Sequence, residues 1–159
     1  MYQRIIVPLD GSELAETALS EAQEMTRLTG APIRLLRVID PVQTQWYGTV
    51  AAAMDYAAVQ AVIDSEKIEA TTYLQAVAKR MSDAGIAVQT EMRQGQVTRA
   101  IVEAAQPGDM IVMASHGRSG ISRWLLGSVA EDVLRHASVP VLLVRAAEPT
   151  DAAKTETTA

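Results

Sequence analysis

Residues 110–144 have the sequence MIVMASHGRSGISRWLLGSVAEDVLRHASVPVLLV. The segment begins and ends with a short apolar run, Met110–Ala114 and Val139–Val144. Between the two runs lie a glycine-rich loop and then a stretch whose apolar residues recur at helical spacing, namely Val129, Val133 and Ala137. Short β-branched runs favour strands, whereas this spacing favours an amphipathic helix. The segment therefore predicts a strand, a loop, a helix and a second strand that runs parallel to the first.

The same alternation extends toward the N-terminus. Further strands are expected at Ile5–Leu9, Ile33–Ile39 and Ile86–Val88. Three further helical periods separate them: Leu14, Ala18 and Met25; Leu74, Val77, Ala78 and Met81; Val97, Ile101, Ala104 and Ala105. Gly30 and Gly85 each stand between a helical period and a strand, where a left-handed helix cap is expected, and Pro107-Gly108 ends the third helix.

Strands that are apolar throughout, rather than at alternate positions, indicate a sheet covered on both faces. Parallel strands joined by right-handed crossover helices satisfy this pattern. We therefore expect a doubly wound, three-layer α/β/α sandwich with a five-stranded, mostly parallel sheet. Ligands of such sheets bind at the carboxyl ends of the strands, near the point where the strand order reverses.

Composition limits the class of protein. The chain has 159 residues, of which 48% are hydrophobic and 21% charged, as in an ordinary protein with a packed core rather than a membrane span. The net charge is -5, and the sequence has no basic run that would follow a nucleic-acid backbone. Cysteine is absent, which excludes disulfides and thiolate chemistry. We expect no nucleic-acid partner and no membrane insertion.

The chain is expected to form one domain over residues 1–145. The apolar run near the N-terminus is cut short by Pro8 and Asp10, too early for a signal peptide, so a cytoplasmic location is expected. A long loop is expected from Asp40 to about Tyr56. Residues 146–159 lack periodicity and are expected to form a disordered tail.

The loop before the last helix has the position of a phosphate-binding loop. Gly117, Gly120 and Gly127 permit close approach of the backbone to a ligand. Backbone amides at the start of the helix, at Gly127, Ser128 and Val129, would donate to an anion there, and Arg118 or Arg123 could add charge.

A purely structural explanation exists for the same residues. Ser128 and Glu131 have the spacing of a capping box, in which Ser128 is the N-cap and Glu131 bonds back to it. The loop is not a Walker motif, because no lysine precedes Ser128, and no G-x-G-x-x-G follows the first strand.

Four segments together resemble the universal stress protein family: IIVPLDGS at residues 5–12, HGRSG at 116–120, Gly127-Ser128, and VPVLLV at 139–144. The resemblance covers Met1 to Arg145 and implies a Rossmann-like fold. The nucleotide-binding branch of that family carries the pattern G-x2-G-x9-G-[ST]. Gly117, Gly127 and Ser128 match it, and Ala114 stands at its first glycine. An alanine with ordinary negative φ can still contact a ligand through its amide.

The resemblance implies a regulatory module that binds ATP, with or without Mg²⁺. Pro8 and Asp10 would then meet the ribose and adenine, Val38 would pack on the base, and Met113 would line the site. Ser128 and Val129 would hold the phosphates. The rest of the expected binding set is Leu9, Ala114, His116, Gly117, Arg118 and Gly127.

No catalytic or metal-binding residue is expected, and any hydrolysis should be slow, because fast phosphoryl transfer needs metal and cationic clamps and a positioned base. A slow ATPase or a serine hydrolase is the enzymatic alternative, but no G-x-S-x-G elbow is present. A dimeric interaction protein that binds no nucleotide is the other alternative. In each case we expect a homodimer through the last strand, a short apolar sheet edge.

Several of these residues have a second interpretation that stays open at this stage. Asp10 could cap the first helix together with Glu13, and Val38 could be an ordinary core residue. Asp40 before Pro41 fits a turn better than a metal site. His116 could be a hydrogen-bonded loop residue, and Trp124 could either form a contact surface or fold onto the core.

Overall fold

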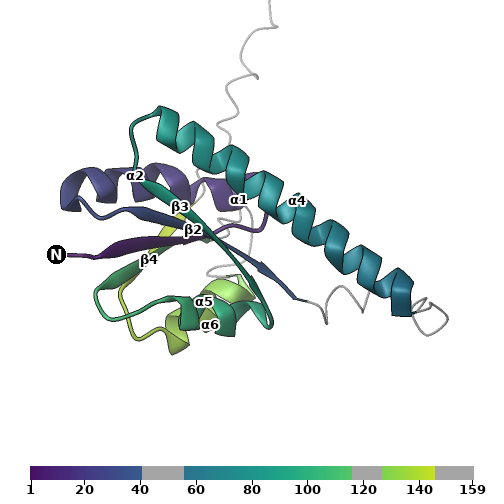
Figure 1. The fold of residues 1–159 in the computed structure, drawn as a ribbon. Coiled ribbons are helices and arrows are strands. Elements are labelled where there is room, and N and C mark those ends of the chain that lie inside the picture. Colours follow the sequence, from purple (N-terminus) through teal and green to yellow (C-terminus); the bar gives the residue numbers. More distant parts are fainter. Residues whose placement is uncertain (41–55, 116–126, 146–159) are drawn as a thin grey trace, which may run out of the picture.

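The computed structural model describes residues 1–40, 56–115 and 127–145 (Figure 1). Strands and helices alternate along these residues. The strands are β1 (Arg4–Pro8), β2 (Ile33–Ile39), β3 (Val88–Gln94), β4 (Asp109–Ser115) and β5 (Val141–Arg145). The helices are α1 (Glu13–Glu16), α2 (Ala18–Thr29), α4 (Tyr56–Asp83), α5 (Val97–Ala104) and α6 (Ser128–His136).

The five strands form one sheet in the order β3-β2-β1-β4-β5, and every pair is parallel. Successive strands move outward from β1 to β3 in one direction and from β4 to β5 in the other. The strand order therefore reverses between β1 and β4, where such folds place their ligands. The expectation of a doubly wound, parallel α/β/α sandwich is confirmed.

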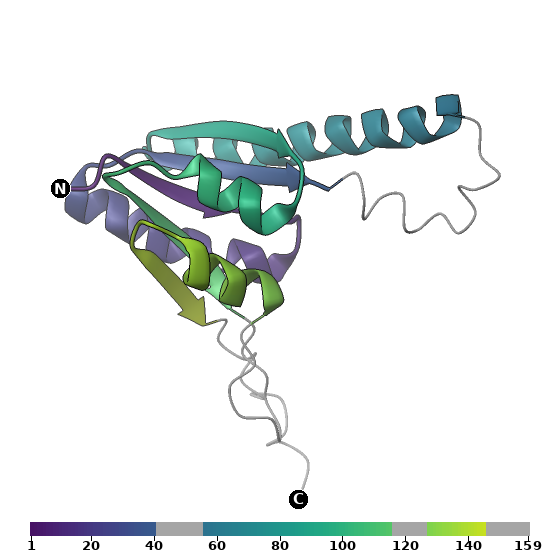
Figure 2. The ribbon, with the colours of Figure 1, turned by 90° about the horizontal axis from the view of Figure 1, so that it is seen from below.

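Helices cover both faces of the sheet and enclose two apolar cores. Helices α2 and α4 lie on one face, whereas α5 and α6 lie on the other (Figure 1, Figure 2). Alternate residues of β1 divide between the cores: Ile5 and Val7 pack toward α2 and α4, and Ile6 packs toward α5 and α6. All three are fully buried.

The third strand differs from its predicted position. Strand β3 runs from Val88 to Gln94, not from Ile86 to Val88, and it is only partly buried. As an edge strand it carries polar side chains on one face: Gln89, Glu91 and Arg93. The apolar residues from which the strand was predicted therefore lie mainly in the turn before β3, where Ile86 is buried, and only Val88 belongs to the strand.

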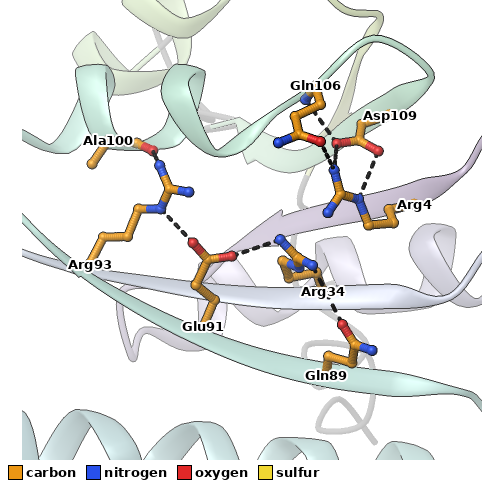
Figure 3. Close-up of polar contacts among 8 residues, drawn as sticks. All are labelled: Arg4, Arg34, Gln89, Glu91, Arg93, Ala100, Gln106 and Asp109. Atoms are coloured by element: carbon orange, nitrogen blue, oxygen red, sulfur yellow. Dashed lines mark hydrogen bonds and ion pairs between the residues drawn. The ribbon is translucent and has the colours of Figure 1, made fainter.

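Ion pairs lie on that face, which is the side of the sheet toward α5, as Figure 3 shows, and Arg93 also donates to the Ala100 carbonyl of α5. Glu91 accepts from Arg34 of β2 at 2.9 Å and from Arg93 at 2.5 Å. Deeper in the sheet, Arg4 of β1 donates to Asp109 of β4 through Nε at 3.0 Å and Nη2 at 2.8 Å. The Asp109 side chain is fully buried, so Arg4 supplies the charge that its carboxylate needs.

Helix α4 also differs from the prediction. It begins at Tyr56 and has 28 residues, although the apolar period starts only near Leu74. Residues 41–55 of the predicted long loop lie outside the described residues, as does the predicted tail. The predicted left-handed conformations are confirmed at Gly30 (φ 75°), which caps α2, and at Gly85 (φ 79°).

Within the described residues, no helix has both the length and the apolar stretch that a bilayer span requires.

Candidate functional site

A cavity of about 620 Å³ opens at the carboxyl ends of the strands, beside the reversal between β1 and β4. Its floor is formed by the ends of β1, β2 and β4, with the loop that follows β1. The start of α6 forms one wall. Residues of α1 and α4 form the other wall: Leu14, Ala15, Glu66, Glu69, Ala70 and Tyr73.

Nine of the twelve residues expected to bind a ligand line this one cavity: Pro8, Leu9, Asp10, Val38, Met113, Ala114, Gly127, Ser128 and Val129. They come from four separate parts of the chain. His116, Gly117 and Arg118 lie outside the described residues, as do Arg123 and Trp124. Ala114 lies in β4 opposite Val144, so it has ordinary extended backbone in which an alanine causes no strain.

The start of α6 does not form the capping box that the sequence suggested. Gly127, not Ser128, is the N-cap, and its carbonyl accepts from the Glu131 amide at 2.9 Å. The Glu131 side chain turns away from the helix start and pairs with Arg135 at 2.9 Å. Ser128 is exposed, and its hydroxyl bonds to none of the described residues. The first amides of α6 have no partner within the helix and border the cavity, so they are available to an anion.

The loop after β1 also differs from the expected capping arrangement. Ser12, not Asp10, is the N-cap of α1, and its Oγ accepts from the Ala15 amide at 3.1 Å. Asp10 supports this cap, because its Oδ1 accepts from the Ser12 amide at 2.9 Å and from the Ser12 hydroxyl at 2.6 Å.

These contacts determine the charge of Asp10. Desolvation alone would raise the pKa of its carboxyl, but the two hydrogen bonds from Ser12 and the positive charge of Arg37 outweigh it, so the pKa lies below its ordinary value. Asp10 is therefore an anionic acceptor at the edge of the cavity at neutral pH, suited to groups that donate hydrogen bonds, such as hydroxyls.

Tyr73 anchors the α4 wall to α1. Its hydroxyl donates to Glu16 at 2.9 Å, and Arg80 donates to the other oxygen of Glu16 at 2.6 Å. Burial raises the pKa of Tyr73, and the hydrogen bond to Glu16 raises it further, so the phenol stays protonated at neutral pH. The wall is held by a network in which each of these side chains has a partner.

Sequence reasoning missed the α4 wall and Arg37, which also line the cavity. A signal existed for Arg37, because it is a charged residue within an apolar strand, RLLRVI at residues 34–39. No local signal marks Glu66, Glu69 or Tyr73, since only packing of α4 against β2 and β3 brings them to the strand ends.

The cavity has two ends of different charge. Among the described residues, four carboxylates and one arginine lie at the end formed by β1, β2 and α4: Asp10, Asp40, Glu66, Glu69 and Arg37. The other end, at Ala114 and Gly127–Ala130, presents backbone and no charged side chain among the described residues. An elongated ligand with one anionic end would therefore be oriented with that end at α6. No group of carboxylates and histidines among the described residues has the arrangement of a metal site.

Comparisons with known proteins agree with this architecture. The universal stress protein family profile matches residues 1–145. Universal stress protein MJ0531 of Methanocaldococcus jannaschii is 32% identical over 91% of this chain and 83% of its own length. Universal stress protein MJ0577 of the same organism is 30% identical over 91% of this chain and 96% of its own length.

Solved structures share the fold. The structure of MJ0577 aligns with a TM-score of 0.75 and 30% identity over 92% of this chain and 98% of that one. A universal stress protein solved in complex with cAMP aligns with a TM-score of 0.65 and 24% identity over 90% of this chain and 97% of that one. Because only 24% of the residues are identical, the match to the cAMP complex shows a shared fold and nothing more.

Proposed function

The chain belongs to the universal stress protein family, and on this basis we propose that it binds an adenine nucleotide, ATP being the expected ligand, in the cavity at the strand ends. The observation that carries the proposal is the convergence of Pro8–Asp10, Val38 and Gly127–Val129 on one cavity at the strand reversal. The cAMP complex of a protein with this fold supports it, since the fold can hold an adenine nucleotide.

Charge determines how the nucleotide would lie. Its phosphates would accept from the unpaired amides at the start of α6, where the helix dipole favours negative charge. Its base would pack on Val38, which is half-buried in β2, and its ribose hydroxyls would donate to Asp10. The reverse orientation would bring the phosphates to the four carboxylates, at a cost in repulsion.

The role that fits this site is regulatory binding. The described lining residues include no lysine, no histidine and no metal cluster with which to stabilise a transferring phosphoryl group. We therefore expect hydrolysis to be slow or absent, and nucleotide occupancy to shift the conformation or the partner affinity of the protein.

A homodimer is part of this proposal. Strand β5 is the last strand of the sheet, pairs only with β4 among the described residues, and carries the apolar sequence VLLV before Arg145. An apolar edge of this kind favours pairing with another strand, and a second copy would supply one.

Calorimetric titration of the purified chain with ATP, with and without Mg²⁺, tests the nucleotide site. Gly127→Val is the informative variant, because Gly127 has φ -58° and ψ 146°, a conformation that valine also adopts. The fold should survive, while the side chain obstructs the approach of phosphates to the amides of α6. Leu28→Val, on the exposed surface of α2, is the matched control.

Saturable binding by the unmutated chain and the control, with loss of ATP binding in Gly127→Val, is the expected result. Unchanged ATP affinity in a folded Gly127→Val variant would show that α6 does not hold the phosphates. If the unmutated chain binds no adenine nucleotide, the alternative of an interaction protein without a nucleotide takes its place.

A further inference from the structure

Arg37 is unusual among the arginines of this protein. Seven other described arginines pair with a carboxylate within 4.0 Å: Arg4, Arg27, Arg34, Arg80, Arg93, Arg99 and Arg135. Arg37 has no such pair among the described residues. Its one hydrogen bond there runs from Nη1 to the Leu9 carbonyl at 3.3 Å, and its Nε is buried without a partner.

The neighbouring polar groups do not satisfy this guanidinium. Asp10 is near enough for its charge to interact with Arg37, but no hydrogen bond or ion pair joins the two side chains, and the Asp10 Oδ1 accepts from Ser12. Tyr73 and Glu16 bond to each other, and Arg80 takes the second Glu16 oxygen. A buried donor without an acceptor is unfavourable, so the buried Nε–H of Arg37 calls for an explanation.

Packing holds Arg37 in this place. A Cβ added at Gly11 would lie 3.7 Å from Arg37 Nη1, so the loop after β1 passes directly beside the guanidinium. Arg37 shares the sheet face of Leu35, which packs in the core under α2 and α4, and it lines the cavity. The side chain is thus positioned in the cavity wall, and the described part of the chain accepts from only one of its nitrogens, Nη1.

We propose that Arg37 is a ligand-binding residue that donates to an acceptor on the nucleoside half of the bound nucleotide, an inference that rests on the proposed function. The location favours the nucleoside over the phosphates. Arg37 is on β2, whereas α6 packs beside β4 on the opposite face of the sheet. Four carboxylates share the Arg37 end of the cavity, so a ribose oxygen or an adenine ring nitrogen fits there better than an anion.

The test compares Arg37→Met with the unmutated chain by calorimetric titration with adenosine, AMP, ADP and ATP. Methionine keeps the apolar stem and removes the donors. Because a hydrogen bond from a charged donor is lost, we expect affinity to fall about tenfold, by the same factor for all four ligands. Arg34→Met, which lies on the same strand and pairs with Glu91 away from the cavity, should leave all four affinities unchanged.

Thermal unfolding separates binding from a structural role. Since Arg37 makes a single long hydrogen bond to the described residues, Arg37→Met should melt close to the temperature of the unmutated chain. A large drop in melting temperature with unchanged affinity would mean that Arg37 is structural and would overturn the inference. A loss of affinity that grows with each phosphate would also overturn it, because Arg37 would then serve the phosphates.

A measurement on the unmutated chain keeps the inference testable if the variant fails to fold. The buried Nε–H of Arg37 should give a resolved ¹H–¹⁵N signal that shifts when adenosine is added. An unmoved signal at saturating adenosine would reject the inference while leaving the nucleotide site intact. Absence of any nucleotide binding by the unmutated chain would instead overturn the proposed function, and this inference with it.

Discussion

Asp10 holds Ser12 by two hydrogen bonds, one from the Ser12 amide at 2.9 Å and one from its hydroxyl at 2.6 Å. Ser12 in turn caps α1 through the Ala15 amide. The residue that the family resemblance places at the ribose therefore also orders the first helix. The two roles are compatible, because a carboxylate can accept about four hydrogen bonds and, among the residues that the structure describes, only Oδ1 accepts any.

Acid should destabilise the protein through Asp10. The pKa of Asp10 is lowered in the folded state, so the stability that its charge contributes is present above the unfolded pKa of about 4 and is lost as pH falls through the folded pKa. We expect Asp10→Asn to be less stable than the unmutated chain at pH 7 and to lose less stability between pH 5 and 3. Melting temperatures across that range measure this, with Asp64→Asn on the exposed side of α4 as the control. Parallel pH profiles for the unmutated chain and Asp10→Asn would contradict it.

Breaking the pair between β1 and β4 should be costly. Arg4→Met leaves the fully buried carboxylate of Asp109 without its cation, and removing one partner of a buried pair typically costs on the order of 3 kcal/mol. Arg27→Met removes an exposed pair with Glu24 and should cost less than about 1 kcal/mol. Urea denaturation gives both free energies of unfolding. Equal losses of unfolding free energy in the two variants would show that the burial of Asp109 does not increase the cost of breaking its ion pair.

Glu131→Ala should be mild. Because Glu131 pairs with Arg135 and does not bond back to the start of α6, the variant loses an exposed i,i+4 pair worth about 0.3–0.5 kcal/mol. A true capping-box residue would cost up to about 2 kcal/mol. Its ATP affinity, measured by calorimetry, should equal that of the unmutated chain, in contrast to Gly127→Val. A loss of more than about 1 kcal/mol in the free energy of unfolding would indicate that Glu131 does form a capping box in solution.

The β5 edge should hold the dimer. Val141→Lys places a charge on the last strand, and charged residues on sheet edges oppose strand pairing. We expect sedimentation velocity to show a monomer for this variant and a dimer for the unmutated chain at micromolar concentration. Leu28→Lys, at an exposed apolar position on α2, should remain dimeric. A dimer that persists in Val141→Lys would place the interface elsewhere.

The sequence alone determined the class of fold and the end of the sheet where the cavity lies. Strand β2 was predicted with its observed bounds, Ile33–Ile39, because its apolar run is bounded by Pro32 and Asp40. Such predictions succeed where burial leaves a mainly apolar run between turn residues and where glycine permits a left-handed cap, as at Gly30. Both signals are local, so one stretch of sequence is enough to show them.

The tertiary structure decided which side chains meet. Edge strand β3 is buried on too little of its surface to leave an apolar run, and α4 reaches the cavity only by packing against β2 and β3. Local spacing predicted the wrong N-cap for two helices. The N-cap of α1 is Ser12 and not Asp10, and the N-cap of α6 is Gly127 and not Ser128. Candidates only one or two residues apart cannot be told apart by spacing. Arg37 has no carboxylate partner among the described residues, and this follows from distances between residues far apart in sequence. Local patterns report periodicity and burial, whereas hydrogen bonds depend on positions that only the folded chain establishes.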